Sequence, residues 1–234
     1  MPSRFPGFPT EMVAFFRGLE KHNTREWFQA RKDVYERSVK APMVTLVEAV
    51  NRELARFAPD YIHDPQKAIY RIYRDTRFSA DKTPYKTHIA AVFPRRGHEK
   101  HGAAGLYFSV SHKEIEVAGG IYMPGPEQLL AVRTHLAAHH EEFRKLLRAR
   151  SLATLMGRLQ GEQLTRPPKG FPAEHPAADL IRYKQWLLYV ILSPESATTP
   201  RLQDEVVKRF KAMAPFVEFL NAPLSLKRRA AVIL

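Results

Sequence analysis

The chain changes from helix-like to strand-like sequence near residue 68 and back to helix-like sequence near residue 124, and this order limits the folds it can adopt. Apolar residues in the first part recur at the spacing of one helix face, as Leu46, Val50 and Leu54 do. Short strand-like stretches joined by turns then occupy residues 68–73, 88–94, 105–112 and 114–122. We therefore expect an α+β fold, in which a mostly antiparallel central meander is covered by helices from the N- and C-terminal parts.

Two signals mark the helices of the N-terminal part. Asn23, with Glu26 three residues later, resembles a capping box that opens a helix running through Tyr35. Pro42 is expected to interrupt that helix, because proline lacks a backbone donor and clashes with the preceding turn.

Other signals mark the later elements. Gly119-Gly120 inside a strand predicts a bulge or a close approach of two backbones. Pro126 suits the first position of a helix. Residues 177–186 are expected to be helical, and residues 187–192 are expected to be a strand or a continuation of that helix.

The length of 234 residues allows one large domain or two. Because we find no internal repeat, low-complexity segment or interdomain linker, we predict a single α+β domain over residues 1–225. Residues 226–234 are expected to form a basic and apolar C-terminal tail.

The chain is strongly basic, with 37 lysines and arginines against 24 acidic residues and a formal net charge of +13. Such an excess favours anionic partners, which include nucleic acid, phosphorylated metabolites and acidic protein surfaces. The basic residues are dispersed rather than gathered in one tract, which also fits a generally basic solvated surface.

The chain has no cysteine, which excludes disulfides, cysteine-ligated zinc, iron–sulfur clusters and a thiol nucleophile. We expect a cytoplasmic protein, because the absence of cysteine fits a reducing compartment and the N-terminus does not resemble a signal peptide. No apolar run approaches the roughly 18 residues of a membrane span, so no membrane partner is expected.

Residues 70–87 combine many charged side chains with tyrosines, and such a segment is costly to bury without partners. If residues 68–73 form a strand, alternation directs Arg71 and Arg74 to opposite faces, and one of them points toward covered sheet. A buried arginine needs a carboxylate or a bound anion, and Asp75 and Asp81 are the nearest carboxylates in sequence.

Two interpretations of this segment stay open. One is an internal arginine–aspartate network, with Asp75 and Asp81 as structural partners, that pins the loop to the sheet. The other is a pocket for a phosphate or carboxylate. The candidate anion-binding residues within the segment are Arg71, Arg74, Arg77, Lys82, Lys86, Tyr73 and Tyr85.

A second group of residues could complete the same site. Lys169 follows a proline pair, and Arg182 lies three residues after Asp179, the spacing of an ordinary helix-surface pair. The alternative is a rigid loop followed by a solvated helix. His135 and His139 have a usable metal-ligand spacing, but the sequence lacks the His-Glu-x-x-His arrangement, and we predict no metal site.

Several motifs resemble a known family of bacterial and fungal conserved hypothetical proteins called domain of unknown function 2461. They occupy residues 22–28, 71–79, 81–87, 119–124 and 168–171, with His175-Pro176 after the last of them. The resemblance covers roughly residues 5–222. The resemblance implies that the family shares these motif positions, but it implies no activity, cofactor or catalytic residue.

The leading hypothesis is a basic, tyrosine-lined pocket that binds a small molecule carrying a phosphate or carboxylate, with or without catalysis. The alternative is a nucleic-acid or protein-binding module that uses the net charge of +13, while residues 70–87 only stabilise the fold. We find no phosphate-binding loop, dinucleotide fingerprint or nucleic-acid-binding motif. The sequence does not identify a cofactor, a reaction or an oligomeric state, and it leaves open whether the protein is an enzyme.

Overall fold

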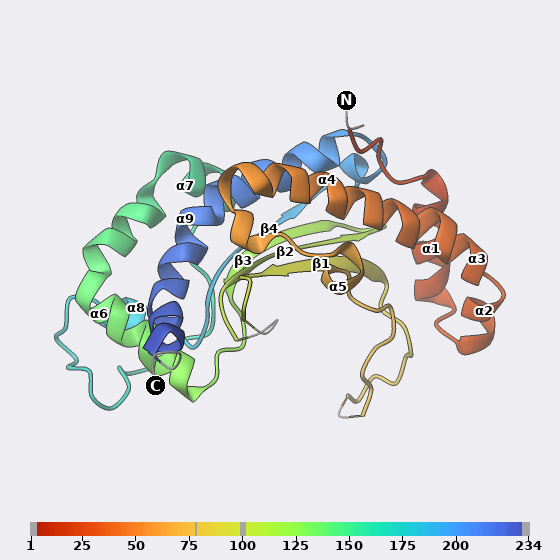
Figure 1. Cartoon of the computed structure of the whole chain (residues 1–234). Helices are drawn as coiled ribbons and strands as arrows, with labels where there is room; N and C mark the ends of the chain where they lie inside the picture. The colour runs from red at the N-terminus through yellow and green to blue at the C-terminus, as the bar shows by residue number, and fades with distance from the viewer. Residues whose placement is uncertain (1–3, 78, 99–101, 231–234) are drawn as a thin grey trace. The chain divides into compact units, whose positions relative to one another are not determined.

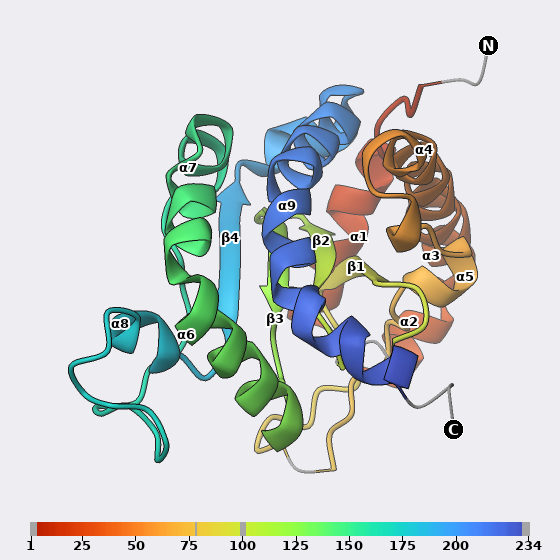
Figure 2. The ribbon, with the colours of Figure 1, turned by 60° about the vertical axis from the view of Figure 1, so that its left-hand side comes forward.

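A computed structural model describes residues 4–77, 79–98 and 102–230, with side chains as far as residue 224. The chain divides into two compact units. The first comprises Met1–Val92, Tyr107–Val117 and Ile191–Lys208, and the second comprises Phe93–Leu106, Ala118–Val190 and Arg209–Leu234. Figures 1 and 2 trace the chain through its elements. The expectation of one domain over residues 1–225 stays a prediction.

A four-stranded antiparallel sheet confirms the predicted α+β fold (Figure 1). Its order, β1-β2-β3-β4, begins with the predicted meander and adds a fourth strand after a long helical connection. The strands are β1 (His88–Pro94), β2 (Gly105–Ser111), β3 (Ile115–Ile121) and β4 (Trp186–Leu192).

Most helices of the first unit precede the sheet in sequence. Apolar side chains on α1 and α4, including Phe16, Leu19, Leu46 and Val50, are fully buried, as their helical spacing predicts. The elements are α1 (Thr10–Lys21), α2 (Arg25–Gln29), α3 (Lys32–Tyr35), η1 (Glu36–Lys40), α4 (Ala41–Phe57), η2 (Pro59–Tyr61), α5 (Pro65–Ala68) and η3 (Pro194–Thr198).

The predicted capping box is wrong by one residue. Thr24 caps α2, and its hydroxyl accepts a hydrogen bond from the backbone N–H of Trp27 at 3.2 Å. Asn23 instead forms two hydrogen bonds with the backbone of Tyr85, which lies 62 residues further along the chain. A residue expected to act locally therefore makes a long-range tertiary contact.

Pro42 does not interrupt the helix as expected, because a π turn precedes it. Over Glu36–Lys40 the helix is wider, and the N–H of Ala41 donates to the carbonyl of Glu36. In a regular α-helix the ring of Pro42 would clash with the carbonyl of Ser38, and the extra residue in the turn relieves that clash. Residues 32–57 thus form a nearly continuous helical path.

The predicted strand over residues 68–73 is also wrong. α5 ends at Ala68, and the residues after it pair with their neighbours only through isolated bridges, Ile69 with Ala91 and Tyr73 with Tyr85. The strict alternation of side chains expected of a strand does not apply here. Arg71 is exposed, and the side chain of Arg74 is 25% exposed, so neither arginine points into covered sheet.

The second unit contains the helices between β3 and β4 and most of the last helix. They are α6 (Pro126–Arg148), α7 (Arg150–Met156), α8 (Ala178–Ile181) and α9 (Arg201–Ala230), of which α9 begins in the first unit. Pro126 begins α6 as predicted, and Figure 2 shows α7 following α6 after a short break. Phe143, Phe216 and Phe219 pack in this unit with ring centroids 4.9–5.7 Å apart.

One expectation for the second unit needs correction. The helix predicted over 177–186 ends at Ile181, and β4 begins at Trp186. The expected C-terminal tail over 226–234 stays a prediction: α9 extends as far as Ala230, and 231–234 lie outside the described residues.

Gly120 confirms a close approach of two backbones. Its φ is +129°, and a Cβ at this position would lie 2.0 Å from the carbonyl oxygen of Trp186. Glycine is therefore required here both for its conformation and for the space beside β4. Among the described residues, no helix combines the length and apolar character that crossing a membrane would need.

Candidate functional site

Residues 70–87, which we call the arm, fold back on themselves in the first unit (Figure 1). The N–H of Arg74 donates to the carbonyl of Pro84 at 2.9 Å, and the N–H of Lys86 donates to the carbonyl of Ile72 at 2.8 Å. These backbone bonds and the Tyr73–Tyr85 bridge make the arm an irregular hairpin. Phe78, within it, lies outside the described residues.

Charged side chains of the arm pair mainly with one another. Arg74 donates to the carboxylate of Asp81 and to Thr83, and Arg77 makes two hydrogen bonds of 3.0 and 2.8 Å with Asp75. Lys82 donates to the carbonyl of Thr76 at 2.9 Å. This pairing supports the interpretation in which Asp75 and Asp81 are structural partners of the arginines.

The aspartate pKa values reflect these contacts. Hydrogen bonds from the side chain and backbone of Arg77 lower the pKa of Asp75 to about 2. The backbone N–H of Thr83, followed by Arg74, lowers the pKa of Asp81 to about 2. Both aspartates are therefore carboxylates at neutral pH, already occupied by donors from the arm.

Aromatic stacking anchors the arm to the helices. The rings of Tyr85 and Phe28 are stacked with centroids 4.2 Å apart, and the ring centroids of Tyr73 and Tyr85 are 5.4 Å apart. Asn23 adds the two hydrogen bonds to the backbone of Tyr85, at 2.9 and 3.0 Å. The arm is thus held at Tyr85 against α2 and the residue Asn23 just before it, and Tyr85 in turn packs on Tyr73.

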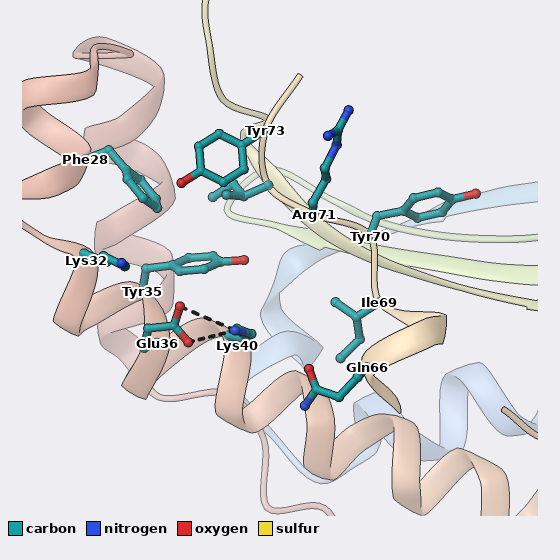
Figure 3. Close-up of a pocket in the computed structure, with 11 residues that line it drawn as sticks. Phe28, Lys32, Tyr35, Glu36, Lys40, Gln66, Ile69, Tyr70, Arg71 and Tyr73 are labelled. Atoms are coloured by element: carbon teal, nitrogen blue, oxygen red, sulfur yellow. Dashed lines mark hydrogen bonds and ion pairs between the residues drawn. The ribbon is translucent and has the colours of Figure 1, made fainter. Parts of the chain in front are cut away.

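A pocket of about 250 Å³ opens between this anchored segment and the helices (Figure 3). Two predicted site residues, Arg71 and Tyr73, line it. The other five candidates of the arm are not among its lining residues. The pocket is lined by Phe28, Lys32, Tyr35, Glu36, Lys40, Gln66, Ile69, Tyr70, Arg71, Ile72 and Tyr73.

Three cations and one carboxylate line the pocket. The Lys40 ammonium lies 3.1 Å from a carboxylate oxygen of Glu36, so these two charges offset each other. Neither Lys32 nor the Arg71 guanidinium has a hydrogen bond or salt bridge with any residue that the structure describes. Both side chains are exposed, and Figure 3 shows the guanidinium directed away from the Glu36–Lys40 pair, at the rim.

Tyr35 gives the pocket a hydroxyl that has no protein partner among the described residues. Its side chain is 6% exposed, and in Figure 3 its hydroxyl points toward the segment that carries Ile69 and Arg71. Burial, reinforced by the charge of Glu36, raises the pKa of Tyr35 to about 12. The hydroxyl is therefore a hydrogen-bond donor at neutral pH and does not act as a base.

Lys86 lies beside the pocket rather than in its wall. Its ammonium donates to the carbonyl of Arg71 at 3.2 Å and lies 5.0 Å from the centroid of the Tyr70 ring. Burial raises the pKa of Tyr70. Lys86 thus contributes to the backbone conformation that presents Arg71.

A family comparison agrees with the resemblance seen in the sequence. A family model described as "Conserved hypothetical protein (DUF2461)" matches residues 11–219. The chain belongs to this family. The match includes the arm, the α2–α4 segment and every residue that lines the pocket. No curated protein matches the chain.

Sequence reasoning missed the helical half of the pocket in this DUF2461 protein. Lys32, Tyr35, Glu36 and Lys40 are spaced at i, i+3, i+4 and i+8, which indicates one helix face. The same spacing also fits an ordinary solvated helix face, so the sequence alone does not mark these residues as a site. The π turn carries Glu36 and Lys40, and such turns are frequent at functional sites.

Lys169 and Arg182 belong to the second unit, and their part in the anion site stays a prediction. Lys169 is exposed in a loop. One guanidinium nitrogen of Arg182 donates a hydrogen bond to the carbonyl of Thr165 at 3.5 Å. Asp179 pairs with Arg144 at 2.7 Å, which corrects the expected pairing with Arg182.

Histidines of the second unit do not assemble a metal site in the part of the chain that the structure describes. The rings of His135 and His139 have centroids 4.5 Å apart. No group of three or more histidine, cysteine, aspartate or glutamate side chains among the described residues could hold a metal ion.

Proposed function

We propose that this protein binds the phosphate or carboxylate group of a small molecule in the pocket of the first unit. The observation that carries the proposal is the pair of cations, Lys32 and Arg71, that line a largely aromatic and apolar pocket and make no hydrogen bond or salt bridge with the residues that the structure describes. Unpaired positive charge next to low-dielectric walls raises the local concentration of anions.

Hydrogen-bond donors support the same proposal. The Tyr35 hydroxyl is protonated at neutral pH and has no described partner, so it can donate to an anionic oxygen. Lys32 supplies further donors from one helical turn away. Because the pocket offers donors and a single carboxylate, Glu36, that is already paired, the proposal concerns binding rather than a particular reaction.

The proposal assigns different roles to the predicted arm residues. Arg71 and Tyr73 face the ligand, whereas Arg74, Arg77 and Lys82 keep the arm folded through their contacts within it. We place this activity in the cytoplasm, because a chain of 234 residues without cysteine fits a reducing compartment.

A thermal-shift measurement tests the proposal, with inorganic phosphate, acetate and short nucleic acids as probes at two salt concentrations. A ligand at about 100 times its dissociation constant stabilises the folded state by roughly 2.7 kcal/mol. We expect one or both anions to raise the melting temperature of the wild type. The combined variant Lys32→Gln, Arg71→Gln should lose this stabilisation.

The matched control is Lys21→Gln, which removes one exposed charge of the same unit outside the pocket. It should keep the wild-type response. If neither anion stabilises the wild type, or if the combined variant responds as the wild type does, the pocket does not bind anions. Stabilisation by short nucleic acids alone, falling log-linearly with salt, would favour the nucleic-acid-binding alternative instead.

A further inference from the structure

We propose that the ligand of this pocket is a phosphate monoester whose organic part is small and apolar or aromatic, an inference that rests on the anion-binding function proposed above. Charge, donor count and the nature of the walls each contribute to this assignment, and each can be tested separately.

The charge balance of the pocket favours a dianion. Glu36 offsets Lys40 at 3.1 Å, which leaves the two positive charges of Lys32 and Arg71. Asp75 attracts Arg71 electrostatically, but both oxygens of that carboxylate are already hydrogen-bonded to Arg77. A carboxylate ligand would neutralise one of the two remaining charges. A phosphate monoester, with a charge of about −1.5 to −2 at neutral pH, would neutralise both.

The available donors also match a phosphate group. Lys32 carries an ammonium on one side of the pocket, the buried Tyr35 contributes its hydroxyl, and the exposed Arg71 guanidinium lies at the rim (Figure 3). Three donors from different residues suit the three terminal oxygens of a monoester better than the two oxygens of a carboxylate. The planar guanidinium of Arg71 can also donate two parallel hydrogen bonds to two oxygens of a phosphate.

The remaining walls are apolar or aromatic. Phe28 and Ile72 are 2% and 5% exposed, and the rings of Tyr70 and Tyr73 extend the surface from the arm. One face of Phe28 is covered by Tyr85, so its ring is held in place rather than free to close the pocket. Such walls favour an apolar or aromatic group on the ligand, because burying that group removes it from water.

The pH dependence of binding distinguishes the two ligand classes. The titratable groups that line the pocket are Lys32 and Tyr35 of α3, Glu36 and Lys40 of the π turn, and Tyr70, Arg71 and Tyr73 of the arm. No histidine lines this pocket. A phosphate monoester changes charge near pH 6, so the dianion fraction falls about tenfold from pH 7 to pH 5.

Isothermal titration calorimetry with phenyl phosphate, benzoate and inorganic phosphate, at pH 7 and pH 5, tests the inference. We expect phenyl phosphate to bind most tightly and to lose about tenfold in affinity at pH 5. Benzoate should bind at least several-fold more weakly, without a comparable loss. Inorganic phosphate should show the same pH dependence as phenyl phosphate, but with lower affinity, because it lacks the organic group.

The outcomes separate this inference from the function on which it rests. If benzoate binds as tightly as phenyl phosphate, or if phenyl phosphate binds equally at both pH values, the phosphate assignment is wrong while the anion pocket stands. If none of the three ligands binds, the proposed function fails as well.

Tyr35→Phe supplies a second test, because it removes the hydroxyl and keeps the buried ring. We expect it to weaken phenyl phosphate binding by about tenfold, the usual effect of losing a hydrogen bond to a charged group. Tyr189→Phe is the control, since it removes a tyrosine hydroxyl from a residue of β4 that does not line the pocket. Equal affinities of Tyr35→Phe and the wild type would contradict the role given to this hydroxyl.

Discussion

Asn23 holds the base of the arm, and its replacement by alanine should measurably destabilise the protein. The side-chain amide donates to the carbonyl of Tyr85 at 2.9 Å and accepts from its N–H at 3.0 Å. Alanine would leave both backbone groups without these partners, next to a side chain that is only 2% exposed. Losing two partly buried hydrogen bonds of this kind costs about 2–3 kcal/mol.

Urea unfolding followed by circular dichroism measures this loss. With a slope of about 3 kcal/mol per molar urea, the midpoint should fall by roughly 0.7–1 M. Gln29→Ala is the matched control, because Gln29 is an exposed amide on α2 without a described side-chain hydrogen bond. Its effect should stay within about 0.5 kcal/mol. An equally small effect of Asn23→Ala would refute the claim that this contact anchors the arm.

Three further predictions concern the arm and the sheet. Arg74→Ala should lower the melting temperature more than Arg77→Ala, because the Arg74 side chain is 25% exposed and the Arg77 side chain is 76% exposed. Calorimetry measures both melting temperatures, and equal shifts would contradict this prediction. The Asp75 and Asp81 pKa values are lowered from 3.8 to about 2, so their contribution to stability should be present above pH 4 and lost as the pH falls toward 2. The variant Asp75→Asn, Asp81→Asn should show a flatter acid-unfolding profile, and an unchanged profile would mean that other groups dominate. Gly120→Ala should cost more than about 3 kcal/mol in urea unfolding, because its Cβ would lie 2.0 Å from the Trp186 carbonyl oxygen. Gly157→Ala should cost less, about 1–3 kcal/mol, because it adds only backbone strain at a φ of +72° and has open space around it.

The meander of β1, β2 and β3 could be predicted from the sequence because these strands are short apolar runs between clear turn signals, whereas residues 187–192 fitted a strand or a helix. The predicted and observed bounds of β1 coincide at His88–Pro94, and those of β2 and β3 differ by one residue at some ends. The segment 68–73 has similar residues but makes only isolated bridges. Tyr73 of this segment contacts Phe28 and bridges to Tyr85, which are distant in sequence, so no local pattern could predict its conformation.

The pocket could be predicted only in part for the same reason. Arg71 and Tyr73 were found because they belong to a segment rich in charge and tyrosine. Arg74 and Arg77 lie in the same charged segment as Arg71, so the sequence does not distinguish them. Only the structure shows that Arg74 and Arg77 pair with aspartates of the arm. The sequence does not single out Tyr35, because only the tertiary fold places it in one pocket with Arg71 and Tyr73, and the π turn before Pro42 has no simple sequence pattern.

Protection of lysines from acylation tests the central claim, that the pocket in the first unit holds an anionic ligand. Limited labelling with acetic anhydride, followed by mass spectrometry, is compared with and without saturating phenyl phosphate. We predict that the ligand reduces labelling of Lys32 and Lys40, which line the pocket, and leaves the exposed Lys21 and Lys67 unchanged. The account would be contradicted if the ligand left the labelling of all four lysines unchanged, or if it reduced the labelling of all four equally.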